Sequence, residues 1–147
     1  MPLTYEGNGI AVAYPDNWSV ESTTTDGDWS VLLQSTGTAF VQLVGQVRPN
    51  GVKPIDACQD SLDATLQALR DDYPELESEP ATERIAGRAA VGQDIRFISL
   101  DLTASCWVRA IDLSKQTLLI LCQASDLELP IAEPVFRAIR ASLRVTE

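Results

Sequence analysis

Carboxylates are the side chains whose number and spacing first suggest chemistry in this sequence. Asp56, Asp60 and Asp63 follow one another at intervals of four and three residues, so on a helix they project from one face. Such a row can attract a divalent cation or supply acid and base groups to a hydrolase. Oxygen-ligand metal sites usually draw on converging loops, and the Asp-x-Asp-x-Asp-Gly pattern is missing. We therefore expect a solvated helix face, with metal binding and catalysis as the alternatives.

The acidic row belongs to a wider excess of negative charge. The chain has 21 acidic and 11 basic residues, a net charge of -10. Residues 54–83 carry nine acids against the single base Arg70. This charge repels phosphate backbones and anionic membrane surfaces, so no nucleic acid partner is expected. The acidic segment is interpreted either as a solvated surface or as a docking surface for a basic protein.

Three arginines and one tryptophan are the other candidate partner-binding residues. Arg137, Arg140 and Arg144 are expected to share the outer face of a C-terminal helix, where they complement its dipole or bind an acidic peptide. They can also pair with the acidic helix of a second copy, giving a homodimer. Trp29 follows a polar hairpin tip. It is expected either to be partly exposed and anchor a partner or to lie across the sheet.

Several classes of active site are excluded by residue type. The chain has no histidine, which removes Ser-His-Asp and Cys-His catalysis and histidine-ligated metals. Cys58, Cys106 and Cys122 show no zinc spacing. If residues 113–115 form a three-residue loop, Cys106 faces Cys122 across two strands; buried thiols are the favoured outcome, with a disulfide as the alternative. The sequence therefore predicts a protein without enzymatic activity or cofactor.

The elements that would position these residues follow from the hydrophobic pattern. Alternating apolar residues and turn signals predict two strand meanders. The first is expected to have four strands, over residues 10–14, 19–24, 29–34 and 39–47. The second is expected to have three strands, over residues 89–100, 103–112 and 116–124. Residues 75–84 are expected to form an exposed connector or an edge strand.

Two helices are predicted from apolar residues at spacings of three and four. The first opens near Pro54 and stops before Pro74, with Asp126 expected to cap the second. The apolar stripe of the first helix consists of Ile55, Cys58, Leu62, Leu66, Leu69 and Tyr73. The stripe of the second consists of Ala132, Val135, Phe136, Ile139 and Leu143.

This order of elements, with three short motifs, resembles the PsbP-like superfamily. The motifs are the corner Tyr14-Pro15-Asp16-Asn17-Trp18, the turn Ile85-Ala86-Gly87-Arg88, and the segment from Phe136 to Arg144. The superfamily includes PsbP, the Ran-binding import factor Mog, DcrB-like lipoproteins and a domain of unknown function that includes type VI secretion chaperones. The resemblance implies an α+β fold in which helices flank a central antiparallel sheet in an α/β/α sandwich. It extends over residues 1–147 as a single domain.

Most known members of this group bind or stabilise other proteins. We therefore expect a protein-interaction or chaperone-like module whose partner is another protein. Met1 is not followed by a signal peptide in the chain as given, so a cytoplasmic location is expected. No apolar stretch is long enough to span a membrane. The alternative function is a small-ligand carrier with a pocket between the sheet and a helix, lined by Trp18, Phe97 and Trp107.

Overall fold

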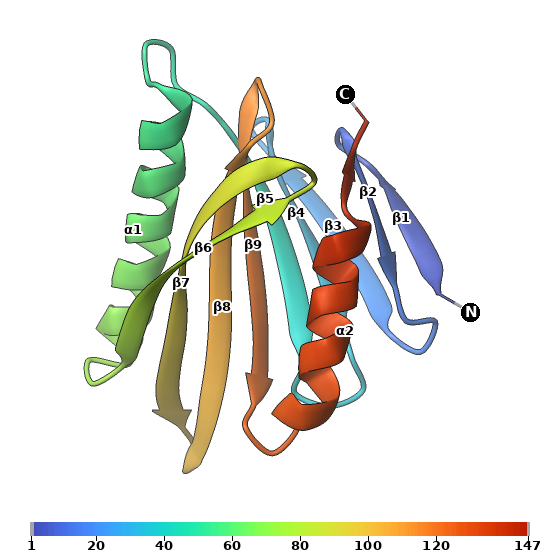
Figure 1. The fold of residues 1–147 in the computed structure, drawn as a ribbon, viewed down its shortest axis with the longest axis vertical. Coiled ribbons are helices and arrows are strands. Elements are labelled where there is room, and N and C mark those ends of the chain that lie inside the picture. Colours follow the sequence, from blue (N-terminus) through green and yellow to red (C-terminus); the bar gives the residue numbers. More distant parts are fainter. Residues whose placement is uncertain (1, 147) are drawn as a thin grey trace.

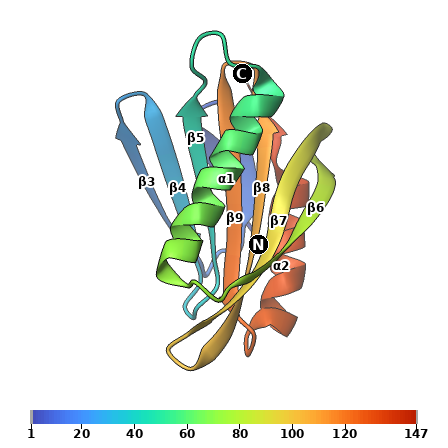
Figure 2. The same ribbon diagram turned by 90° about the vertical axis from the view of Figure 1, so that its left-hand side faces the viewer.

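The computed structural model describes residues 2–146. Its centre is a seven-stranded sheet in which neighbouring strands are all antiparallel (Figures 1 and 2). In spatial order the strands are β3 (Ser19–Thr25), β4 (Asp28–Gln34), β5 (Phe40–Val47), β9 (Gln116–Ser125), β8 (Leu102–Asp112), β7 (Arg88–Ser99) and β6 (Glu77–Ile85). Figure 1 shows three layers, with α1 on one side of this sheet and α2 on the other. The predicted α+β class and the antiparallel sheet between helices are confirmed.

Helix α1 (Pro54–Asp72) covers one face of the sheet. Proline occupies its first turn, where a missing N–H costs nothing, and Pro74 prevents its continuation. Cys58 and Leu62 lie in the core between α1 and the sheet. Ile55, expected in the apolar stripe, is instead 59% exposed. It lies in the first turn of α1, ahead of the first buried residues Ala57 and Cys58.

The other face is covered by α2 (Leu129–Ser142) and a small sheet. This sheet has the order β1 (Leu3–Gly7), β2 (Ile10–Tyr14) and β10 (Arg144–Val145). Phe136 is fully buried and packs perpendicular to the rings of Trp18 and Trp107. The prediction of a four-stranded first meander is wrong, because β2 pairs with β1 and β10 and not with β3.

The register of the β8–β9 hairpin corrects the expected cysteine pairing. Asp112 faces Thr117, and the backbone N–H of Leu113 donates to the carbonyl of Gln116 at 2.8 Å. The loop therefore has two residues rather than three, and Cys106 faces Gln123. A one-residue shift moves a side chain to the other face of a sheet, so the two cysteines lie in different cores. All three cysteines are free and buried, which confirms the favoured prediction.

Asp126 does not cap α2 as predicted. The helix begins at Leu129 after Glu128, which makes no side-chain capping bond. Asp126 instead accepts hydrogen bonds from Arg96 at 2.9 Å and from the Ser105 hydroxyl at 2.8 Å. Its carboxylate thus holds the loop between β9 and α2 against the sheet. Within the described residues, no helix is both long and apolar enough to cross a membrane.

Candidate functional site

The predicted acidic row lies where the helical spacing placed it. Asp56, Asp60 and Asp63 are exposed on the outer face of α1, and Asp63 accepts a hydrogen bond from Gln59 at 2.8 Å. Over residues 2–146, no three histidine, cysteine or carboxylate side chains come together in a way that could hold a metal. The row is therefore a charged, exposed helix face.

The three arginines do not share one surface. Arg137 is exposed and pairs with Glu133 one turn earlier, at 2.7 Å. Arg144 lies beyond the helix in β10 and is exposed. Arg140 points inward, with its guanidinium 5.6 Å from the centre of the Trp107 ring. Only Arg137 thus extends from the outer face of α2, and the expected basic face is wrong.

Arg140 belongs to a partly buried ionic cluster that links four elements. The Arg109 Nε atom donates to Glu83 at 2.6 Å, and its Nη2 donates to Asp94 at 2.7 Å. The Nε of Arg140 lies 3.5 Å from the same Glu83 oxygen. Two cations face two carboxylates, so the charges balance. Their attraction offsets part of the free-energy cost of removing the charged groups from water. The cluster joins β6, β7, β8 and α2 and is a structural feature.

The cysteines are not activated nucleophiles. Burial raises the pKa of the Cys58 and Cys106 thiols. Burial also raises the pKa of Cys122 to about 11, although the nearby Arg140 opposes the shift. Since a thiolate is the reactive form, thiols with raised pKa values are inert at neutral pH.

Trp29 is not exposed as a partner anchor would be. Its side chain is 5% exposed, and its Nε1 donates to the Gln116 amide oxygen at 2.8 Å. The indole lies so close to Gly45 on the neighbouring strand that a Cβ there would overlap it. The favoured interpretation, a tryptophan lying across the sheet, describes the structure, and the alternative of a partly exposed partner anchor is wrong.

A surface that the sequence did not reveal lies at one end of the molecule. Both ribbon views place the β7–β8 hairpin and the β9–α2 connection at the lower end, and the backbone N–H of Asp126 donates to the Thr103 carbonyl at 2.8 Å. Large apolar side chains are exposed on both segments. We call this set the apolar end; it consists of Ile98, Leu100, Leu102, Leu127 and Ile131.

The tip of the β7–β8 hairpin is strained. Ser99 faces Leu102, so Leu100 and Asp101 form a two-residue turn. Both have positive φ, at 51° and 64°, as a type I′ turn requires. Asparagine and glycine favour this geometry, whereas a left-handed conformation costs other residues about 1–2 kcal/mol. Leu100 therefore combines backbone strain with a side chain that is 94% exposed, so packing against the described residues does little to offset the strain.

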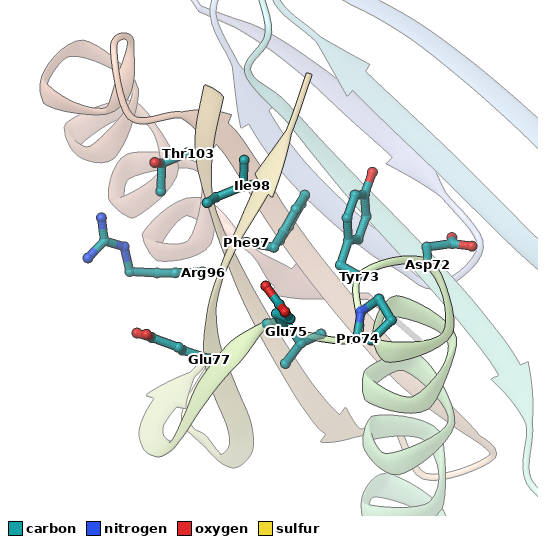
Figure 3. A pocket seen from close by; sticks show the side chains of 10 residues that line it. Asp72, Tyr73, Pro74, Glu75, Glu77, Arg96, Phe97, Ile98 and Thr103 are labelled. Carbon is teal, nitrogen blue, oxygen red and sulfur yellow. The ribbon is translucent and has the colours of Figure 1, made fainter. Parts of the chain in front are cut away.

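A pocket of about 660 Å³ adjoins the apolar end. Figure 3 shows it between the loop after α1 and the end of β7. Its apolar wall is made by Tyr73 and Phe97, whose rings stack with centres 4.3 Å apart. Ile98 lines the pocket as well as belonging to the apolar end. The pocket and the apolar end therefore form one continuous surface.

Acidic side chains surround this surface. Asp72, Glu75 and Glu77 line the pocket, and Asp101 is exposed at the hairpin tip. Arg96 also lines the pocket, but its guanidinium is paired with Asp126 at 2.9 Å. The surface thus offers apolar contacts within a negatively charged rim, an arrangement that favours a basic and apolar partner.

The residues of the expected ligand pocket are not brought together. Trp18 and Trp107 pack on Phe136 in the core beneath α2, whereas Phe97 lies on the opposite face with Tyr73. The hairpin tip could have been suspected from one signal. Leucines flank Asp101 at a turn that lacks glycine, asparagine and proline, whereas the hydrophobic pattern predicts Leu100 as the last residue of a strand.

Comparison with known proteins identifies the fold. No protein-family model and no curated protein matches the chain. The solved structure of cyanobacterial PsbP from Synechocystis sp. PCC 6803 is similar, with a TM-score of 0.71 and 11% identity over 98% of this chain and 92% of that one. A variant of protein Mog1 has a TM-score of 0.62 and 10% identity, over 100% of this chain and 96% of its own. PA94, a Pseudomonas aeruginosa protein of unknown function, has a TM-score of 0.57 and 15% identity, over 96% and 94%.

Proposed function

The chain has the PsbP-like fold, and from its surface we propose that it is a non-enzymatic interaction module. It binds a basic partner protein through the apolar end. The observation that carries this proposal is Leu100, exposed at the tip of a strained turn. Residues held in strained backbone conformations cluster at functional sites. The family resemblance implies the same class of function.

The expected partner surface follows from the chemistry of the apolar end. Leu100 and its apolar neighbours need an apolar recess, since exposed patches of this kind mark protein contacts. The carboxylates around the pocket need lysine or arginine side chains opposite them, which raise the association rate and select the partner. The stacked rings of Tyr73 and Phe97 offer a flat apolar wall to one inserted side chain.

The proposal is tested with synthetic amphipathic peptides of leucine and lysine, and with matched peptides in which glutamate replaces lysine. Binding is measured by interferometry on the intact protein. We expect binding of the basic set only. Burying one leucine side chain is worth about 1.5–3 kcal/mol, so Leu100→Ser should weaken binding by about ten- to a hundredfold.

The matched control is Ile55→Ser, which removes an exposed apolar side chain from the first turn of α1. In Figure 1, α1 begins at the end of the molecule opposite the β7–β8 hairpin. This variant should bind as the wild type does. Equal binding of acidic and basic peptides, or equal losses in Leu100→Ser and Ile55→Ser, would contradict the proposed surface.

A small-ligand carrier is the second candidate function, favoured by the size of the pocket and its stacked aromatic wall. A native mass spectrum of the purified protein, followed by a denatured one, separates the two candidates. Extra mass that disappears on denaturation would support the carrier. A bare chain that binds the basic peptides would support the interaction module.

A further inference from the structure

Strand β3 is an open edge of the large sheet. It lies at the end of the strand order and pairs only with β4 among the described elements. Figure 2 shows it as the outermost strand of the sheet, opposite β6. All seven of its residues are exposed, so the strand lacks cover on its faces as well as at its outer edge.

The two edges of the sheet differ in how they are protected. Natural edge strands usually carry proline, lysine, inward charges or bulges that prevent pairing with another chain. Strand β6 has Pro80 and several charged residues in the sequence ESEPATERI. Strand β3 has the sequence SVESTTT, with a single charge at Glu21 and no proline or lysine. Its valine and threonines are β-branched residues that favour strand pairing.

The β3–β4 register determines which backbone groups are unpaired. Thr25 faces Asp28 across the two-residue turn Asp26-Gly27, and residues flanking such a turn exchange both hydrogen bonds. Hydrogen-bonded pairs then alternate along the ladder. The N–H and C=O groups of Thr24, Ser22 and Val20 therefore point away from β4.

These outward residues are symmetric about Ser22. We propose that β3 pairs with β3 of a second copy in an antiparallel arrangement whose two-fold axis passes beside Ser22. Ser22 then exchanges two hydrogen bonds with Ser22 of the second copy. Val20 exchanges two with Thr24 of the second copy, and the reverse pair forms by symmetry. Every outward donor meets an outward acceptor, and the two large sheets become one.

The side chains are compatible with this register. Val20, which is half-exposed, lies opposite a threonine, a β-branched pair that stabilises adjacent strands. Glu21 lies opposite Thr23 of the second copy and not opposite its own counterpart. The two Glu21 side chains are diagonal neighbours on the same face, and each copy has a net charge of -10. Salt should therefore strengthen the dimer by screening this repulsion.

The contact is limited to one short strand from each copy. Interfaces of such small area are usually weak and transient, so we expect a dimer that forms reversibly as the concentration rises from micromolar to millimolar. The native thiols do not interfere with a cross-linking test, because Cys58, Cys106 and Cys122 are buried.

The first experiment measures the register by cysteine cross-linking under mild oxidation. In the proposed dimer the two Ser22 Cα atoms are about 5.5 Å apart, a distance that a disulfide spans. Ser22→Cys should therefore form a covalent dimer. Val20→Cys places its two thiols about 13 Å apart along the strands and should form little. The double variant Val20→Cys, Thr24→Cys should cross-link again. Equal yields from the two single variants, or a higher yield from Val20→Cys, would overturn the register.

The second experiment measures the oligomeric state of the full chain by sedimentation. Ser22→Lys places two like charges beside the two-fold axis and should abolish the dimer, although it lowers the net negative charge. Thr82→Lys makes the same charge change on the exposed surface of β6 and should leave the dimer intact. A wild-type chain that stays monomeric at millimolar concentration in high salt would overturn the proposal. So would equal effects of the two lysine substitutions.

Discussion

The strain at the β7–β8 turn predicts that Leu100→Asn stabilises the fold. Leu100 has a φ of 51° and a side chain that is 94% exposed, so the substitution removes little packing. Asparagine adopts the left-handed conformation at lower cost because its side chain bonds locally. We expect the free energy of unfolding to rise by about 1 kcal/mol, which for a domain of this size is a shift in Tm of about 2–4 °C. Urea denaturation and calorimetry measure both quantities.

Leu127→Asn is the matched control for this prediction. Leu127 is also exposed in the apolar end, but its φ is not among the positive values. Its substitution should change stability by less than about 0.5 kcal/mol. A Leu100→Asn variant that is neutral or less stable than the wild type would refute the reasoning, because it would mean that the leucine is not strained. If Leu100→Asn is more stable and also fails to bind the basic peptides, the strain is kept for binding.

Three further predictions concern the core. Gly45→Ala should destabilise the fold by about 1–3 kcal/mol, because its Cβ would overlap the Trp29 indole; an unchanged urea midpoint would show that the indole moves aside. Arg109→Met should cost about 2–3 kcal/mol, since Glu83 loses a partner at 2.6 Å, and adding Glu83→Gln should restore part of this loss. The pKa of Cys122 is raised from 9.0 to about 11. The unfolded chain therefore loses this proton first, stability falls as pH rises from 9.0 to about 11, and urea titrations should show a smaller fall in Cys122→Val.

Much of the architecture could be predicted because it depends on local signals. The period of α1, the turn residues Asp26-Gly27 and the breaks between the later strands are all local in sequence, and each lies within about one residue of the expected position. The small sheet could not be predicted in the same way. Strand β1 has the short and mostly exposed sequence LTYEG, in which only Leu3 and Tyr5 are large apolar residues, and β10 has only two residues. Both strands form by pairing with β2. For β10 the paired residues are more than a hundred positions apart in the sequence, a separation that local patterns do not reveal.

The candidate site was less predictable because its features depend on register and on backbone conformation. A single residue in the length of the β8–β9 loop decided whether Cys106 or Trp107 faces Cys122. Helical spacing placed Arg140 beside other arginines, but spacing does not show that Trp107 and Glu83 lie beneath the helix. The strain at Leu100 is a property of φ, and an apolar residue at the end of a strand pattern resembles the strand itself.

The two proposed contact surfaces are compatible with each other because of where they lie on the sheet. Strand β3 forms one edge, while the apolar end is built on β7, β8 and the start of α2, with β4, β5 and β9 between them. A β3-mediated dimer would therefore leave both copies of Leu100 accessible. Two such tips held at a fixed separation bind a multivalent partner more tightly than either does alone, provided that the geometry allows both to engage. A weak dimer and a modest single contact can then combine into a selective interaction.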